Sequence, residues 1–178
     1  DRHVRLLADV NGDGREDIVA FGTDGVWLSL ATSGGYFSAP AFVLANFGFN
    51  QGWTPTLHVR TTADLNGDGR QDIIGFGDEG VWTALSTGNG FAPSQFVLAE
   101  FGYNAGGWRV ERHPRLLADI NRDGKQDIVA FGNDGVWIAR SAGNGSFAAA
   151  QFVQANFGYN QGWRVSKHPR FVADLNGD

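Results

Sequence analysis

The chain of 178 residues contains no cysteine and no methionine, and only five prolines. Without cysteine it has no disulfide framework, no thiol nucleophile and no thiolate metal site. No stretch of about eighteen apolar residues is present, so we expect no membrane insertion. Because the first residue is not methionine and both ends fall inside a repeated pattern, we interpret the sequence as a processed product or a piece cut from a longer chain.

Positive charge is also scarce, with 14 Lys and Arg residues against 19 Asp and Glu residues and a net charge of −5. A nucleic-acid-binding surface needs clustered Lys and Arg side chains, so we expect no nucleic-acid partner. Apolar residues make up 42% of the chain, which is enough to bury a core and excludes a disordered polyelectrolyte. The 26 glycines indicate many tight turns rather than long helices.

One phrase occurs four times, starting at Leu6, Thr61, Leu116 and Phe171. Its first aspartates are 55 residues apart, and all six tryptophans and all four histidines recur with this period. The period predicts one domain, residues 1–178, built from repeats at about 1–55, 56–110 and 111–165, with a partial fourth at 166–178.

Each repeat contains short apolar runs, such as residues 18–21 and 26–30, bounded by Gly, Asn, Asp or Pro. Val, Ile, Phe and Trp dominate these runs, which indicates about four strands per repeat and no convincing helix. Successive apolar residues within a run predict a sheet that is covered on both faces. We therefore predict an all-β fold of β-propeller blades, each with four antiparallel strands, comprising three full repeats and the start of a fourth. A parallel β-helix is the alternative, although its repeats are usually much shorter.

A propeller normally needs about four to eight blades to close its ring, and three cannot. An isolated copy would leave apolar blade faces in water, which usually marks an interface. We expect either a homo-oligomer whose copies complete the ring, or a segment of a longer propeller. The duplicated opening segment, residues 3–9 and 168–174, would let one copy supply the closing strand of its neighbour.

Three complete acidic loops follow the pattern D-x-N-x-D-G-x-x-D. Oxygen ligands at alternate positions of a tight loop suit Ca²⁺, which accepts six to eight oxygens with flexible geometry. We expect structural calcium on the side chains, and on the carbonyl of the basic residue, in three sets: Asp9, Asn11, Asp13, Arg15 and Asp17; Asp64, Asn66, Asp68, Arg70 and Asp72; Asp119, Asn121, Asp123, Lys125 and Asp127.

Two departures from this pattern matter for the calcium prediction. Arg122 replaces a glycine of the third loop at a position that is not a ligand, so we expect that site to persist. A fourth loop, with Asp174, Asn176 and Asp178, stops before its last ligand and should be weak or empty. The competing interpretation is that the Asn-Gly and Asp-Gly pairs only form turns between strands.

The acidic loop followed by IVAFG at residues 18–22 resembles the FG-GAP type of calcium-binding blade found in integrin-like propellers. The segments FGYNAGGWRVERHPR (residues 101–115) and FGYNQGWRVSKHPR (residues 157–170) resemble more specifically the repeats of the Psathyrella velutina lectin family of mushroom seven-bladed propellers. The resemblance covers essentially the whole chain. It implies binding of N-acetylglucosamine, and also of sialic acid, in pockets between consecutive blades.

The segment between repeats supplies the aromatic faces and polar groups that a sugar site needs. The candidate sugar-binding residues are Asn50, Trp53 and His58; Tyr103, Asn104, Trp108, Arg109 and His113; Tyr159, Asn160, Trp163, Arg164 and His168. Because Phe49 lacks the tyrosine hydroxyl and Thr54 replaces arginine, we expect the first pocket to be the weakest. The mid-strand residues Trp27, Trp82 and Trp137 are expected in the core, and Arg5, Arg60, Arg115 and Arg170 in strand-end ion pairs.

These observations predict a multivalent lectin for N-acetylglucosamine-type glycans, sialylated ones included. The alternative is a structural or adhesion FG-GAP propeller that binds a protein partner. An enzyme is disfavoured because no G-x-S-x-G motif is present and every histidine is repeated, whereas a catalytic site is normally unique. Low-affinity calcium loops fill outside cells, so we expect a secreted or extracellular protein.

Overall fold

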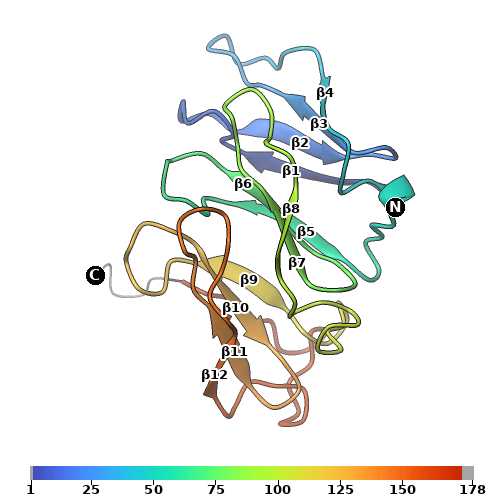
Figure 1. The fold of residues 1–178 in the computed structure, drawn as a ribbon, viewed down its shortest axis with the longest axis vertical. Coiled ribbons are helices and arrows are strands. Elements are labelled where there is room, and N and C mark those ends of the chain that lie inside the picture. Colours follow the sequence, from blue (N-terminus) through green and yellow to red (C-terminus); the bar gives the residue numbers. More distant parts are fainter. Residues whose placement is uncertain (1, 174–178) are drawn as a thin grey trace.

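The computed structural model describes residues 2–173 and contains three four-stranded sheets, which follow one another in chain order (Figure 1). Every described sheet is antiparallel, and each strand pairs with the next along the chain. Sheet 1 comprises β1 (Val4–Ala8), β2 (Asp17–Phe21), β3 (Val26–Ser29) and β4 (Ala41–Leu44). Sheet 2 comprises β5 (Val59–Ala63), β6 (Asp72–Phe76), β7 (Val81–Ala84) and β8 (Gln95–Leu98). Sheet 3 comprises β9 (Arg115–Ala118), β10 (Asp127–Phe131), β11 (Val136–Ala139) and β12 (Gln151–Gln154).

The prediction of three repeats of four antiparallel strands is confirmed. Within residues 2–173 the only helical element is a short 3-10 turn, η1 (Phe49–Gln51), and no helix is long and apolar enough to cross a membrane. The fourth repeat forms no strand over residues 166–173. Closure into a ring stays a prediction.

A glycine and a register shift shape the outer hairpin of each sheet. The pairing of β3 with β4 shifts between Val26 and Trp27, and the same shift occurs in the other two sheets. Gly25, at φ 147°, lies against the outer strand, and a Cβ there would lie 2.1 Å from the Leu44 carbonyl oxygen. Only glycine fits at such an approach, which explains why Gly80 and Gly135 occupy the equivalent positions.

A buried aspartate connects each acidic loop to its sheet through hydrogen bonds. Asp17 accepts hydrogen bonds from the backbone N–H of Val10 at 3.0 Å and of Ala31 at 2.7 Å. Asp72 and Asp127 accept the equivalent pairs of bonds in sheets 2 and 3. This aspartate therefore has a structural role in the acidic loop and in the outer hairpin of each sheet.

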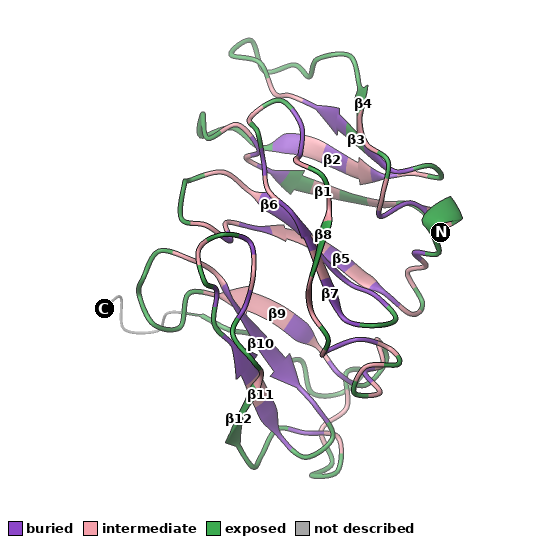
Figure 2. Cartoon of the chain, in the orientation of Figure 1, coloured by how far each residue is buried: buried purple, intermediate pink, exposed green. Residues whose placement is uncertain are grey.

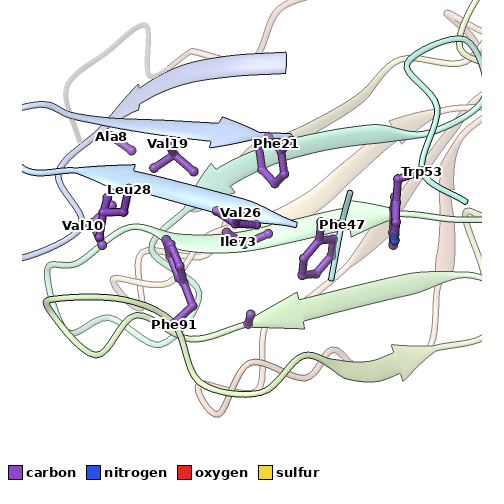
Figure 3. Close-up of a cluster of buried hydrophobic side chains, with 11 residues drawn as sticks. Ala8, Val10, Val19, Phe21, Val26, Leu28, Phe47, Trp53, Ile73 and Phe91 are labelled. Carbon is purple, nitrogen blue, oxygen red and sulfur yellow. The ribbon is translucent and has the colours of Figure 1, made fainter. Parts of the chain in front are cut away.

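The core lies between the sheets rather than within any one of them. Figure 3 shows Phe21, Val26 and Phe47 of the first repeat packed toward Ile73 and Phe91 of the second. An equivalent cluster joins sheets 2 and 3. Strands β6 and β10 are buried along their whole length, whereas β2 alternates between buried and partly exposed residues, because the described chain covers sheet 1 on one face only (Figure 2).

The same hydrogen bonds occur at both sheet junctions, as the same apolar contacts do. The Ser86 hydroxyl donates to the Val10 carbonyl at 2.6 Å, and Ser141 donates to Leu65 at the same distance. The backbone N–H of Gln71 donates to the Asp9 carbonyl, and the equivalent bond recurs at the second junction. The two junctions are therefore copies of one interface.

Candidate ligand-binding site

A cleft opens at each junction between sheets. Cleft A, between sheets 1 and 2, has a volume of about 300 Å³, and cleft B, between sheets 2 and 3, has a volume of about 190 Å³. Both are at or below the lower end of the range for small-molecule pockets and suit a ligand of monosaccharide size. Cleft A is lined by Trp53, His58, Asp78, Glu79 and Trp82, and cleft B by the equivalent residues Trp108, His113, Asn133, Asp134 and Trp137.

A local turn sets the histidine of each cleft in one orientation. The backbone N–H of Thr54 donates to Nδ1 of His58 at 3.1 Å. Since Nδ1 accepts, the neutral ring carries its proton on Nε2, which donates to the Asp78 carboxylate at 3.1 Å. The same turn makes His113 donate to the Asn133 side-chain oxygen at 2.9 Å. Burial lowers the pKa of His113, because it disfavours the charged imidazolium.

The tryptophans exchange the roles that the sequence suggested. Trp53 and Trp108, candidate ligand contacts, are only 6% and 7% exposed and pack on buried phenylalanines at the base of the clefts. Trp82 and Trp137, expected in the core, are partly exposed and line the clefts. Trp27 is 41% exposed, so its assignment to the core is wrong. The reason is that the preceding sheet covers Trp82 and Trp137 only in part, whereas no sheet precedes sheet 1 within residues 2–173 to cover Trp27.

The candidate asparagines do not line the clefts but support their acidic rims. Asn104 donates its amide to Glu79 at 2.9 Å, and Asn160 donates to Asp134 at 2.8 Å. Asn50 makes the same bond to Asp24 at 2.6 Å. These acidic residues, absent from the predicted set, follow each second strand, and their period of 55 residues was the available signal.

The tyrosine and arginine candidates stack on each other outside the cleft linings. The Arg109 guanidinium lies 3.6 Å from the Tyr103 ring centroid and donates to the Tyr103 carbonyl at 2.7 Å. Arg164 and Tyr159 form an equivalent pair at 3.8 Å. The expectation of a weakest first pocket rests on Phe49 and Thr54, which occupy the positions equivalent to this pair and do not line cleft A.

The third set of candidate residues, around Trp163 and His168, makes the same local contacts as the first two sets. Within residues 2–173, however, no further sheet completes a cleft beside it. Trp163 packs on His168 with ring centroids 5.4 Å apart, and the Arg164 N–H donates to His168 Nδ1 at 3.1 Å. No sheet follows within residues 2–173 to supply an acidic turn and a second tryptophan. A more open groove of about 410 Å³ lies there instead, with Phe131 and Phe157 among its lining residues.

Three of the four repeated arginines are buried, Arg60 and Arg115 at the two junctions and Arg170 against sheet 3. The Arg115 Nη1 donates to the Phe101 carbonyl at 3.1 Å, and the guanidinium lies over Phe76. Arg60 and Arg170 make equivalent contacts with carbonyl groups. The expectation of ion pairs is therefore wrong for these three, because a backbone carbonyl is the partner in each case. Burial lowers the pKa of Arg115 to about 10.

In each acidic loop, backbone N–H groups donate hydrogen bonds to the side chain of the first aspartate. Asp9 accepts hydrogen bonds from the N–H groups of Gly12, Asp13 and Gly14, and Arg15 pairs with Asp13. The second and third loops repeat these bonds. Arg122, at φ 60°, keeps the bond that its glycine counterparts make, at 2.7 Å.

The donor chemistry of these loops fits a hard cation, since carboxylate and amide oxygens alternate along each loop. Within residues 2–173, however, no three or more His, Cys, Asp or Glu side chains converge as a metal site would require. Asp72 shows why: it is fully buried, both its oxygens accept backbone N–H bonds, and burial raises its pKa to about 6. Calcium binding stays a prediction, and the fourth loop lies outside the described residues.

Comparison with solved structures shows that this chain is similar to a lectin. A lectin of Agrocybe aegerita, described by its specific recognition of non-reducing terminal N-acetylglucosamine, is similar over 99% of this chain, with 34% identity and a TM-score of 0.65. The chain spans 58% of the length of that lectin.

The similarity also extends to parts of a large toxin. The Photorhabdus luminescens Tc holotoxin pore matches over 90% of this chain and 7% of its own, with 19% identity and a TM-score of 0.62. At that identity only the fold is shared. No curated protein matches the chain significantly.

The family described as FG-GAP-like repeat matches residues 9–74 and 119–178, which together are more than half of the chain. These two segments contain all three of the complete acidic loops. The chain therefore belongs to the FG-GAP-like repeat family.

Proposed function

We propose that this protein is a lectin that binds N-acetylglucosamine-type glycans in the clefts between consecutive sheets, by recognition rather than catalysis. One observation carries the proposal: the same group of a lining tryptophan, a buried tryptophan–histidine pair and a polar rim occurs at both junctions. The 34% identity to a lectin of that specificity supports the choice of ligand.

The cleft residues match the chemistry of such a sugar. The partly exposed indoles of Trp82 and Trp137 supply an apolar surface for the C–H face of a pyranose ring. The carboxylate of Asp78 in cleft A and the side-chain amide of Asn133 in cleft B face ring hydroxyls or the acetamide. His58 and His113 donate to these groups and hold them in place.

The rims also favour neutral over sialylated sugars. Cleft A carries two adjacent carboxylates, Asp78 and Glu79, which repel the carboxylate of sialic acid. In cleft B, Asn133 replaces Asp78, but Glu100 joins Asp134 in the lining, so this cleft carries two carboxylates as well. Binding of a sialylated glycan should therefore be weaker than binding of a neutral one in both clefts.

Repetition supplies avidity in this proposal. A single cleft that binds a monosaccharide at millimolar strength contributes about −4 kcal/mol. Several clefts held on one rigid propeller ring, completed by a homo-oligomer, gain roughly 10² to 10⁴ in avidity on a glycan-coated surface. Because such surfaces lie outside cells, a secreted or extracellular location is part of this proposal. A stoichiometric protein complex in the absence of any sugar binding would favour the adhesion alternative.

The cleft tryptophans provide the test. Titration of the protein with N-acetylglucosamine, followed by the indole N–H resonances in NMR spectra, should shift the signals of both clefts. Trp82→Ala should abolish the response of cleft A only, and Trp137→Ala that of cleft B only. Tyr36→Ala is the control, because Tyr36 is 76% exposed in an outer loop and lines neither cleft. A wild-type spectrum unchanged by the sugar would refute the proposal.

We also propose that Ca²⁺ binds the three acidic loops in a structural role. Asp9, Asn11 and Asp13, with the Arg15 carbonyl, would hold it in the first loop, together with the equivalent residues of the other two. The ion would neutralise the loop carboxylates and fix the turn between the first two strands of each sheet. Calcium at 100 times its Kd should stabilise the fold by about 2.7 kcal/mol per site. A melting temperature that is the same in calcium and in EGTA would exclude this role.

A further inference from the structure

The outer faces of sheets 1 and 3 are less covered than their counterparts at the internal junctions. On sheet 1, Phe37 is 48% exposed, whereas its equivalents Phe91 and Phe147 are 7% and 8% exposed. After sheet 3, Phe157 is 37% exposed, whereas Phe47, its equivalent, is fully buried. The outer face of sheet 1 thus corresponds to the faces that sheets 2 and 3 turn to the preceding sheet. The outer face of sheet 3 corresponds to those that sheets 1 and 2 turn to the following sheet, and the chain's own residues after β12 partly cover it.

The polar contacts of an internal junction are available on these faces as well. The backbone N–H of Gln71 reaches the Asp9 carbonyl across the first junction. Its counterparts on the outer faces are the N–H of Glu16 and the carbonyl of Asp119, and both are backbone groups. The established junctions are therefore a template for a contact between two copies of the chain.

We propose that sheet 3 of one copy docks on sheet 1 of a second copy, and that this contact completes a third ligand cleft, built from both copies. Two copies bring six sheets together, within the four to eight of closed propellers, whereas three copies would bring nine. The contact is head-to-tail, and two copies close it with two identical junctions.

The third cleft takes its two halves from different copies. Trp163 comes from the first copy and corresponds to Trp53 and Trp108. Asp24 and Trp27 come from the second copy and correspond to the acidic residue and lining tryptophan of the other clefts. This assignment explains why Trp163 and Trp27 are the most exposed members of their two sets.

The histidine of this cleft is present twice, as His168 of the first copy and His3 of the second. His3 contacts Thr23 at 3.2 Å, as His58 contacts Asp78 within sheet 2. Residues 3–8 and 168–173 are equivalent segments that compete for one place at the junction. Either segment supplies the same histidine, so the composition of the cleft is the same in both arrangements.

The ligand of the third cleft rests on the proposed function, so the experiment reports on the two separately. Trp163→Ala and Trp27→Ala each remove one half of the third cleft and leave clefts A and B intact. With N-acetylglucosamine as the probe, the indole signal of Trp27 should stop responding to the sugar in Trp163→Ala, and that of Trp163 should stop responding in Trp27→Ala.

Mixing the two variants should restore both responses. In a mixed dimer one junction carries both substitutions, while the other combines an intact Trp163 with an intact Trp27. Half of the mixed-dimer junctions therefore regain the cleft. Responses of cleft A and cleft B without any response from Trp27 and Trp163 would overturn the third cleft and leave the proposed function standing. No response at any tryptophan would overturn both.

Assembly has its own readout. Light scattering at micromolar concentration should give twice the 19.2 kDa mass of the chain. Phe37→Asp should halve the measured mass, because it places a charge in the copy junction. Phe96→Asp is the matched control, since Phe96 and its equivalents Phe42 and Phe152 remain 44–45% exposed in all three sheets. A monomeric wild-type chain, or a dimer indifferent to Phe37→Asp, would overturn the proposal.

Discussion

Gly75, in the middle of β6, lies directly beneath the tryptophan at the base of cleft A. A Cβ at this position would lie 2.7 Å from Cη2 of Trp53 and 2.9 Å from Cε1 of Phe47, about 0.7 Å short of ordinary contact with the indole. Gly75→Ala must therefore displace a buried ring in a close-packed junction. Overpacking of this kind costs about 1–3 kcal/mol, and the lower backbone entropy of the unfolded state offsets about 0.4–1 kcal/mol of it.

Urea unfolding measures the result, with an expected loss of about 1–2 kcal/mol at an unchanged slope. The melting temperature should fall by about 2–4 °C for each kcal/mol lost. Gly90→Ala is the matched control, because its Cβ would meet Val43 at an ordinary 3.5 Å. N-acetylglucosamine should bind more weakly in cleft A, which Trp53 lines, and equally well in cleft B. Equal stability of the two variants would refute the packing argument.

Three further substitutions test the junctions and the clefts. Ser141→Ala should cost about 0.5–1.5 kcal/mol in urea unfolding, because it removes the bond to the Leu65 carbonyl. The equivalent residue in sheet 1 is Ala31, so Ala31→Ser should tighten the dimer about 2- to 10-fold in sedimentation experiments, and unchanged affinity would contradict the proposed contact. The pKa of His113 is lowered in the folded state, so its contribution to stability is lost as pH falls through the unfolded value of about 6.5. His113→Asn should flatten this decline in thermal melts, and a slope that matches the wild type would contradict the assignment.

Much of the fold follows from the repeat. The period of 55 residues and the short apolar runs predict three units of four antiparallel strands, because residues at equivalent positions face equivalent surroundings. The family resemblance pointed to FG-GAP-like repeats and to junctions between units as binding places. The family comparison confirms the first of these. Clefts A and B lie at the junctions, and ligand binding there stays a prediction.

The identity of the cleft residues required the tertiary structure. Trp53 and Trp82 both recur with the same period, so spacing alone cannot tell which is buried. That depends on which face of each strand the next sheet covers. Asp78 and Glu79 were not predicted as cleft residues, because in the sequence they are ordinary turn residues. Only the packing of this turn against the neighbouring repeat makes them part of cleft A.

The sequence by itself determined the repeat, the strands and the number of sheets, because local patterning and turn chemistry act within one unit. Only the tertiary structure decided which aromatic side chains line the clefts and which support them. These roles arise from contacts between residues far apart in the sequence, such as Phe47 and Ile73. Burial at such contacts depends on how two sheets pack against each other, and the sequence of one repeat alone does not determine that packing.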